Sequence, residues 1–194
     1  MKIYLLRHFT EIDKTNFSSP LDMDGLKDAD DIVERLEKLP IDKIYCSPFL
    51  KAIQSVYPYC KANNKHINPE STFHDAMYSP IETRIDMHER KNFDNHFGYN
   101  YLYDSVNMHY KSKLFSSNVP LIETETEVKN RIFPFFYNLC NRYKNQNKNI
   151  LIVTHQPIID IILKFFVSSA NCSVVVNEQI TEINVGKAWA KLKC

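Results

Sequence analysis

Hydrophobic residues occur along this chain in two patterns, as short continuous runs and as longer segments with helical spacing. The runs at residues 2–6 and 149–154 are continuous and rich in residues that favour strands, so each predicts a buried strand. Shorter runs predict a strand at residues 43–46 and edge strands at residues 174–176 and 181–185. Four segments with helical spacing begin near residues 22, 47, 123 and 157. Strands that alternate with helices are typical of an α/β protein with a largely parallel sheet.

Local sequence features predict where the first two helices begin. Asp22 or Asp24 can cap a helix that runs to about residue 39, where Pro40 stops it. Ser47 followed by Pro48 predicts the next start, with the hydroxyl as cap and the proline at the first helical position. The first helix is expected to turn four hydrophobic residues toward the core, namely Leu26, Ala29, Val33 and Leu36.

From about residue 63 to 121 the sequence has no clean period. A stretch of this length within a compact domain is usually an insertion that covers a functional face. The sequence therefore predicts one domain over residues 1–194, a three-layer α/β/α sandwich with a mostly parallel central sheet and a cap at about 63–121. Four tyrosines of this stretch are expected either to pack the cap or to line a pocket for an apolar or aromatic substrate: Tyr99, Tyr101, Tyr103 and Tyr110.

Charge and cysteine content narrow the class of protein. Lys and Arg total 24 and Asp and Glu total 23, so the net charge of +1 gives no reason to expect nucleic acid or an anionic membrane as a partner. The five cysteines include no Cys-x-x-Cys pair, which favours free thiols in a reducing compartment. The apolar N-terminal run is too short for a signal peptide, and the longest apolar stretch contains Asp160 and Lys164. We therefore expect a soluble, cytoplasmic protein.

Two histidines and an arginine follow the two clearest strands. Arg7 and His8 come directly after the first strand, and His155 comes directly after the strand at 149–154. Because ligands bind beyond the carboxyl ends of the strands in open α/β sheets, these side chains could converge. A lone histidine in such a place is more often structural. Two in equivalent positions, one of them preceded by arginine, favour a site for phosphate.

Phosphoryl transfer needs positive charge around the phosphate oxygens, and an arginine offers them a bidentate fork. The helix expected to begin at Ser47 would point its first N–H groups toward the same face. A neutral imidazole can act as the nucleophile if an acceptor holds its other nitrogen, and a carboxylic acid must protonate the leaving oxygen. This chemistry therefore asks for one arginine, two histidines, a second cation and one carboxyl group.

Five segments match motifs of one known family, in the order in which that family has them. LLRHFTE is similar to L-x-R-H-G-x-T, PLDMDGLKDA to P-L-T-x-x-G-x-x-Q-A, and IYCSPFLKAIQS to Y-S-S-P-x-x-R-A-x-Q-T. ETETEVKNRIFPFF is similar to E-S-x-x-D-V-x-x-R, and NILIVTHQP to a strand that ends in V-S-H-G or V-T-H-G. On these motifs the chain resembles the histidine phosphatase superfamily, phosphoglycerate-mutase-like, branch 1. The resemblance implies a phosphatase or mutase that needs no metal and no cofactor.

The resemblance also implies a role for each matching residue. His8 would be the phosphorylated nucleophile, Arg7 would clamp the phosphate, and His155 would stabilise the transferring group. Lys51 falls where the family has its second arginine, and a lysine there keeps the charge but loses the fork. Without the motif around it, Lys51 would be interpreted as a solvated helix lysine. The candidate substrate-binding residues are Lys51, Ser47, Gln156 and Glu11.

Two residues compete for the role of general acid. HINPESTFHDAMY resembles the stretch of some eukaryotic-type members in which the acid follows a Val-Glu-Pro-like turn, and this register favours Asp75. Glu89 in MHER resembles the L-x-E-R acid motif of other members but lies farther along the chain. Because aspartate is one methylene shorter than glutamate, either the backbone at Asp75 comes closer to the site or the acid works less well.

Three residues depart from the family pattern. Phe9 and Gln156 replace the glycines after the two histidines, and Glu11 stands where the family has Thr or Ser. The ring of Phe9 must point away from the phosphate or narrow the pocket. Since the two histidines and Arg7 are kept, the favoured function is hydrolysis of a small-molecule or protein phosphomonoester through a phosphohistidine on His8.

Two alternatives stay open. One is a phosphoglycerate-type mutase, although mutases that resemble this chain tend to be longer. The other is a catalytically impaired pseudophosphatase that serves as a phosphate- or phosphopeptide-binding module. The sequence leaves the oligomeric state open. The remaining histidines lack the spacing of a metal site and are expected to be exposed loop residues: His66, His74, His88, His96 and His109.

Overall fold

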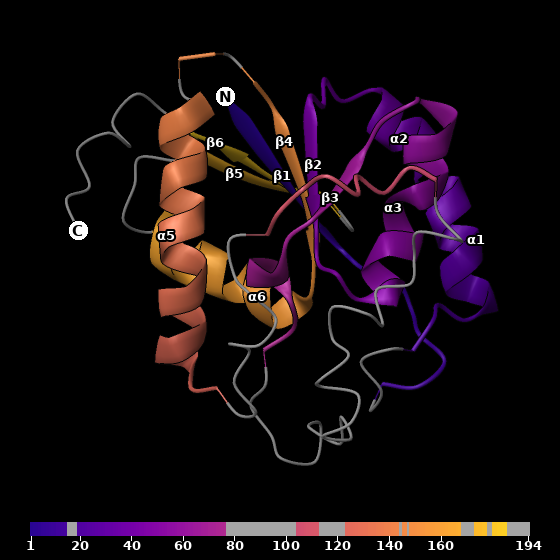
Figure 1. Cartoon of the computed structure of the whole chain (residues 1–194), viewed down its shortest axis with the longest axis horizontal. Helices are drawn as coiled ribbons and strands as arrows, with labels where there is room; N and C mark the ends of the chain where they lie inside the picture. Colours follow the sequence, from indigo (N-terminus) through magenta and orange to yellow (C-terminus); the bar gives the residue numbers. More distant parts are fainter. Residues whose placement is uncertain are drawn as a thin grey trace.

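In the computed structural model of this chain, one central sheet has six strands in the order β3-β2-β4-β1-β6-β5 (Figure 1). The structure describes residues 1–14, 19–76, 104–112, 123–143, 145–146, 148–167, 173–177 and 180–185. The strands are β1 (Lys2–Arg7), β2 (Lys43–Cys46), β3 (Ile67–Pro69), β4 (Ile150–Thr154), β5 (Ser173–Asn177) and β6 (Ile180–Asn184). The helices are α1 (Met23–Asp31), α2 (Val33–Glu37), α3 (Leu50–Ala62), α5 (Glu125–Tyr143) and α6 (Gln156–Ile162), with a 3₁₀ turn η1 (Ser71–Phe73) and a π-helical turn η4 (Leu163–Val167).

The sheet is mostly parallel, as the sequence predicted. Strands β3, β2, β4 and β1 run in one direction, β6 is antiparallel to β1, and β5 is antiparallel to β6. The expectation of two edge strands is right for β5 and wrong for β6, which lies between β1 and β5. Ile180, Thr181 and Ile183 of β6 are buried, which suits a strand that is paired on both sides.

Helices cover both faces of the sheet and make the predicted three layers (Figure 1). α1, α2 and α3 lie against one face, and α5 and α6 lie against the other. Along β1, Tyr4 and Leu6 enter the core on the α1–α3 side, whereas Ile3 and Leu5 enter it on the α5–α6 side. All of β4 is buried, as expected for a parallel strand with both faces covered. The continuous hydrophobic run seen in the sequence is explained by this double coverage.

The start of α1 follows the sequence prediction. Asp22 is the N-cap residue, and its Oδ1 accepts a hydrogen bond from the Gly25 N–H at 2.7 Å. The inward face is less regular than predicted, because Leu26 is 40 % exposed while Ala29 and Leu36 are buried. A break at Ile32 separates α1 from α2, so the one helix that the sequence predicted is divided in two.

The predicted start of α3 is wrong. The helix begins at Leu50 with Phe49 as its N-cap residue, and no side chain caps it. The Ser47 hydroxyl accepts only a long bond, 3.3 Å, from the Phe49 N–H. The reason lies in the tertiary structure, because the same hydroxyl is 2.8 Å from Nε2 of His155.

β3 was not expected, since it lies in the stretch interpreted as an insertion. It pairs in parallel with β2, and Val106 forms an isolated bridge with Ile67 beyond it. A strand of three residues that contains a proline carries too little pattern to be found in a sequence. The predicted cap falls largely on residues 77–103 and 113–122, which lie outside the described part of the chain.

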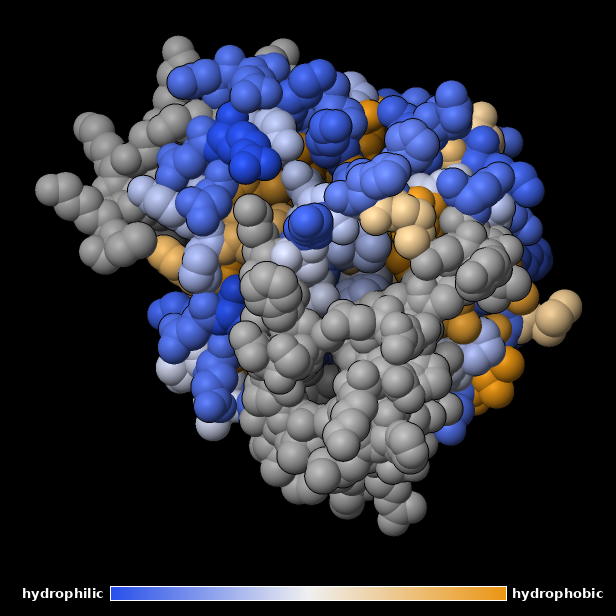
Figure 2. Space-filling model, viewed as in Figure 1, coloured by the Kyte–Doolittle hydropathy of each residue, from blue (hydrophilic) through white to orange (hydrophobic). Residues whose placement is uncertain are grey.

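Hydrophilic side chains dominate the described surface on the face shown in Figure 2. Smaller hydrophobic areas lie between them, one of them beside α5. Within the described ranges, no helix combines the length and the apolar character that crossing a membrane requires.

Candidate active site

The carboxyl ends of β1, β2 and β4 meet at one edge of the sheet, and a polar side chain follows each of them. His8 follows β1, Ser47 follows β2, and His155 follows β4. The backbone N–H of His8 donates to the Thr154 carbonyl at 3.0 Å. This hydrogen bond continues the β1–β4 pairing past the end of the strands. The rings of His8 and His155 lie with centroids 4.9 Å apart and planes inclined by 58°. The structure thus brings the two histidines within reach of one small anion.

His8 is held in the form that a nucleophile requires. Its Nδ1 is 2.7 Å from the Phe9 carbonyl oxygen. Because a carbonyl can only accept, Nδ1 donates and Nε2 keeps its lone pair. Burial, followed by the charge of Lys51, lowers the pKa of His8 to about 4. The imidazole is therefore neutral near pH 7.

His155 is completely buried between Ser47 and Asp75. Its Nε2 is 2.8 Å from the Ser47 hydroxyl, and its Nδ1 is 3.4 Å from Oδ2 of Asp75. Burial, and then the proximity of His8, holds the pKa of His155 well below its usual value. Ser47, predicted both as a helix start and as a substrate-binding residue, thus lies at the site with its hydroxyl on this imidazole.

Of the two candidates for the general acid, Asp75 and Glu89, the structure describes only Asp75. Asp75 reaches the site, as its distance from His155 shows, and its side chain is 22 % exposed. Its Oδ1 accepts from the Ala76 N–H at 2.9 Å, which fixes the direction of the carboxyl group. Glu89 lies outside the described residues. The structure places one of the two candidates beside the histidines, at the edge open to solvent.

Lys51 and Glu11 form an ion pair at the site. Lys51 lies in the first turn of α3 and is only 2 % exposed. It is therefore not the solvated helix lysine that would be expected without the motif around it. Its Nζ is 3.1 Å from Oε1 of Glu11. The other oxygen of Glu11 is 3.7 Å from Nδ1 of His8. The second cation therefore already has a carboxylate partner, which the sequence alone did not reveal.

The loop that carries Glu11 is fastened to the start of α1. The Asp22 N–H donates to the Thr10 carbonyl at 3.1 Å, and the Thr10 hydroxyl donates to Asp22 Oδ1 at 2.8 Å. Gly25 lies so close to the Thr10 carbonyl oxygen that a Cβ would collide with it. This contact explains the glycine of the PLDMDGLKDA segment. Phe9 is buried in the core on the α1–α3 side, so its ring packs among hydrophobic side chains there.

The backbone before Asp75 is held by a buried ion pair that sequence reasoning did not single out. Nε and Nη2 of Arg131 each donate to a different carboxylate oxygen of Glu123 at 2.7 Å. Nη1 of Arg131 also donates to the carbonyl of Thr72 at 2.6 Å and to that of His74 at 3.2 Å. Glu123 and Arg131 are the first and last residues of the ETETEVKNR match. The motif was therefore found in the sequence, but the ion pair between its ends was not predicted. The pair fixes the segment that presents Asp75.

Glu70 is a second buried carboxylate beside this segment, and it was not among the site residues predicted from the sequence. Its Oε1 accepts from the Thr72 N–H at 3.0 Å, the Thr72 hydroxyl at 2.8 Å and the Ser112 hydroxyl at 2.7 Å. Its Oε2 accepts from the Tyr110 hydroxyl at 2.5 Å. These four hydrogen bonds satisfy the buried carboxylate and tie residues 110–112 to η1.

Two candidate residues lie at the margin of the site. Arg7 is the exposed last residue of β1 and directly precedes His8, and its charge contributes to the lowered pKa of His8. Gln156 is exposed, and its Nε2 donates to Asp160 at 2.8 Å along α6. Arg7 is thus accessible from the solvent, whereas the Gln156 side chain is engaged on the helix surface.

His74 corrects the expectation that the other histidines are exposed. It is completely buried, and its Nδ1 donates to the Asp75 carbonyl at 2.6 Å. Burial, followed by the charge of Arg131, holds the pKa of His74 well below its usual value. Long-range packing against Phe49 and the Arg131 segment buries it, and no local pattern encodes such contacts. His66 and His109 are exposed, as expected.

Three buried neutral histidines should make the protein sensitive to mild acid. His8, His74 and His155 all have lowered pKa values in the folded protein, whereas unfolded histidine titrates near 6.5. Below that pH the unfolded chain takes up protons that the folded chain does not, so the free energy of unfolding falls as pH falls. We expect a loss of roughly 1.4 kcal/mol per pH unit for each of the three between about pH 6.5 and 5.

Denaturant unfolding at several pH values from neutral to mildly acidic measures this slope. His74→Phe removes one titrating group and should make the slope shallower, while His66→Phe, at an exposed position, should leave it unchanged. A flat profile in this pH range would contradict the assignment of three neutral buried histidines.

Among the described residues, no group of three or more His, Cys, Asp or Glu side chains is arranged to hold a metal ion. Cys46, Cys60 and Cys140 are buried free thiols, and burial raises the pKa of Cys46 well above its usual value.

The fold and the site together define a class of protein: an α/β sandwich whose strand ends hold two facing histidines, with cations and a carboxyl group around them. The model of the histidine phosphatase superfamily (branch 1) matches residues 3–172 of the 194, and the chain belongs to this family. The resemblance inferred from the five motifs is thereby confirmed. No curated protein matches the sequence.

Solved structures with the same fold include phosphatases and a mutase. Ecdysone phosphate phosphatase from Bombix mori, solved with tungstate, superposes with a TM-score of 0.64 at 13 % identity, over 97 % of this chain and 92 % of that one. A putative alpha-ribazole-5'-P phosphatase from Escherichia coli gives 0.60 at 16 % identity, over 95 % and 96 %. Phosphoglycerate mutase from Bacillus anthracis gives 0.60 at 14 %, over 98 % and 94 %. At these identities the likeness shows the fold.

Proposed function

We propose that this protein hydrolyses phosphomonoesters in two steps through a phosphohistidine on His8. The observation that carries the proposal is the state of His8, which is neutral, donates from Nδ1 to the Phe9 carbonyl, and faces His155 at 4.9 Å. An imidazole fixed in this tautomer presents Nε2 as a nucleophile without prior loss of a proton. The substrate class is a small-molecule or protein phosphomonoester, and the free buried thiols support a reducing compartment such as the cytoplasm.

In the first step, Nε2 of His8 attacks phosphorus and the bond from phosphorus to the ester oxygen breaks. Asp75, in its protonated form, gives its proton to the leaving oxygen. Arg7 and Lys51 supply positive charge to the phosphoryl oxygens, and His155 lies beside the attacking imidazole. In the second step, water attacks phosphorus, Asp75 takes a proton from that water, and the bond between phosphorus and His8 breaks. Phosphate leaves, and the proton has returned to Asp75.

Detection of the intermediate tests the proposal. After brief exposure to a generic aryl phosphate, the denatured protein should carry one phosphoryl group that is lost in acid and kept in alkali, located on His8 by peptide mass spectrometry. Steady release of the aryl alcohol with no phosphoryl group trapped under rapid quench would overturn the proposed intermediate. Transfer of phosphate between positions of a phosphorylated glycerate, in place of release to water, would favour the mutase.

The ion pair of Glu11 with Lys51 favours a second candidate function, a phosphate-binding module with little or no turnover. A dianionic phosphate at His8 would meet the Glu11 carboxylate, and it must compete with Glu11 for Lys51. Binding of phosphate without turnover, together with no phosphoenzyme, would identify this function.

Removal of the Glu11 charge should strengthen phosphate binding. Glu11→Gln eliminates a carboxylate near His8 and leaves Lys51 without an ionic partner, so its charge becomes available to the anion. We expect roughly tenfold tighter binding of inorganic phosphate and a similar fall in KM for an aryl phosphate. Glu34→Gln makes the same change of charge at an exposed position on α2 and should alter neither value. Weaker binding in Glu11→Gln would show that Glu11 supports the site.

A further inference from the structure

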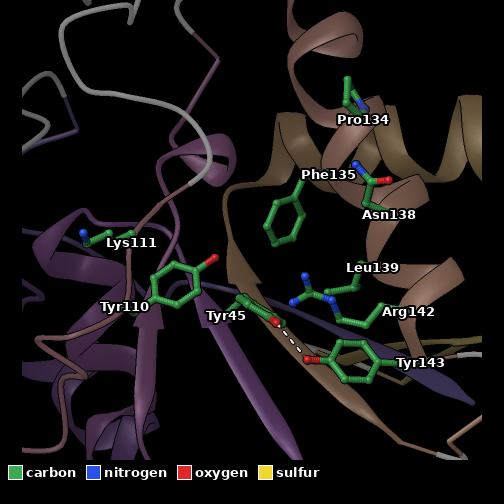
Figure 3. A pocket seen from close by; sticks show the side chains of 9 residues that line it. All are labelled: Tyr45, Tyr110, Lys111, Pro134, Phe135, Asn138, Leu139, Arg142 and Tyr143. Atoms are coloured by element: carbon green, nitrogen blue, oxygen red, sulfur yellow. Dashed lines mark hydrogen bonds between the residues drawn. The ribbon is translucent and has the colours of Figure 1, made fainter.

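A second pocket lies away from the histidines, between α5, β2 and the segment 104–112 (Figure 3). Its volume is about 230 Å³. Tyr45 from β2, Tyr110 from the segment, and Phe135 and Tyr143 from α5 form its aromatic lining. No residue of the His8 site lines it. The pocket is therefore a separate feature of the fold, on the α5 side of the sheet, where Figure 2 shows hydrophobic surface between hydrophilic residues.

The lining presents ring edges and faces in a fixed arrangement. The ring of Tyr45 meets Phe135 edge-on, with centroids 5.4 Å apart at 81°, and meets Tyr110 at 5.8 Å and 65°. Such edge-to-face contacts are favourable and hold the rings in place. A cavity of about 150 Å³ is enough for benzene, so this pocket can take a substituted ring or a small pair of fused rings.

Positive charge borders the aromatic lining. Arg142 and Lys111 both line the pocket, and both are exposed. Neither has a carboxylate partner within salt-bridge distance in the part of the chain that the structure describes. The hydroxyls of Tyr45 and Tyr143, 3.4 Å apart, add polar groups beneath Arg142 (Figure 3). Burial raises the pKa of Tyr45, so its phenol stays protonated and does not neutralise these cations.

We propose that this pocket binds a small aromatic anion, an arene carrying a carboxylate or sulfonate, with the ring against Tyr45 and Phe135 and the charge toward Arg142. The aromatic lining accounts for the ring, and Arg142, which has no carboxylate within salt-bridge distance among the described residues, accounts for the negative charge. This ligand site is independent of the reaction proposed for His8.

The pocket is connected to the segment that presents Asp75. The hydroxyl of Tyr110, which forms one wall of the pocket, donates to Glu70. Glu70 also accepts from the backbone N–H and the hydroxyl of Thr72. The ring of Phe135, another wall, packs on Phe73 with centroids 5.1 Å apart. A ligand that shifts either wall therefore acts on η1, which directly precedes Asp75. Occupancy of the pocket should change the protection of the amides in residues 71–76.

Calorimetric titration with naphthalene-2-sulfonate tests the binding. Excess inorganic phosphate is kept in the solution so that the His8 site is occupied and cannot take the sulfonate. We expect binding to the wild-type chain, a loss of roughly tenfold in affinity in Arg142→Ala, and no change in Lys61→Ala, which removes an exposed lysine from α3 on the other face of the sheet. The neutral analogue 2-naphthalenemethanol and the ring-free anion methanesulfonate should both bind more weakly.

Three results would overturn the site: no measurable binding, equal affinity in wild type and Arg142→Ala, or displacement of the probe by phosphate. The link to Asp75 has its own readout, since the probe should alter hydrogen exchange of residues 71–76 in wild type and much less in Tyr110→Phe. Binding without any change in that exchange would refute the link. Neither readout uses turnover, so a failure of the proposed phosphatase activity would leave both results interpretable.

Discussion

His8→Ala should lower kcat/KM for an aryl phosphate by roughly 10⁴-fold or more, the scale of loss found when an enzyme loses its nucleophile. Alanine offers no nitrogen to phosphorus. The neighbouring His155 cannot take its place easily, because it is completely buried and its Nε2 faces Ser47. The measurement is steady-state turnover, together with the yield of trapped phosphoenzyme, which should fall to background.

A matched control separates this loss from a general disturbance. His66→Ala removes an exposed histidine and should keep turnover within about twofold of wild type. His8→Ala itself should remain folded by circular dichroism and should still bind phosphate through Arg7 and Lys51. Turnover that persists in His8→Ala, with the phosphoryl group on another residue, would contradict the assignment of the nucleophile.

Arg131→Ala should have the largest effect on stability, because it leaves the carboxylate of Glu123 buried without its partner. Both side chains are nearly inaccessible, at 5 % and 1 % exposure. Removal of one member of such a pair costs about 3–5 kcal/mol in free energy of unfolding. It also removes the donors to the Thr72 and His74 carbonyls, so the segment before Asp75 loses its anchor. Denaturant unfolding measures the first effect.

Leaving-group dependence measures the second effect of the Arg131 change. If Arg131 positions Asp75, an alkyl phosphate, which needs the proton, should lose turnover by about 10²-fold, and an aryl phosphate with a good leaving group should lose much less. The double variant Glu123→Gln with Arg131→Met removes both charges and keeps a folded chain available if Arg131→Ala does not fold. Lys129→Ala takes a positive charge from the same helix and should show neither effect. Equal losses on both substrates would assign Arg131 a purely structural role.

The parts of the fold that the sequence predicted are those encoded within a few residues of one another. β4 is a continuous hydrophobic run that is buried on both faces. Asp22 caps α1 by accepting a hydrogen bond from the Gly25 N–H, three residues later. The Thr124 hydroxyl accepts from the Glu127 N–H at 3.2 Å and helps to begin α5 where helical spacing was seen. In each case the signal lies within a few consecutive residues, so local pattern is enough to find it.

The parts that the sequence missed depend on partners far along the chain. The Ser47 hydroxyl could have capped α3, but His155 lies beside it, 108 positions later in the sequence. β6 became an interior strand because β5 pairs with its outer side. His74 is buried by packing that no local pattern encodes. Competition between local and long-range partners is decided only when the chain is packed.

The sequence by itself determined the family, the three layers, and the two histidines at neighbouring strand ends, because strand order and motif order leave little choice for them. Only the tertiary structure decided what surrounds those histidines. It paired Lys51 with Glu11, gave Asp75 its place beside His155, and set Glu123 and Arg131 behind the segment that carries Asp75. The physical reason is that the charge and burial of a site depend on side chains from elements distant in sequence. Only the packing of those elements decides which side chains meet.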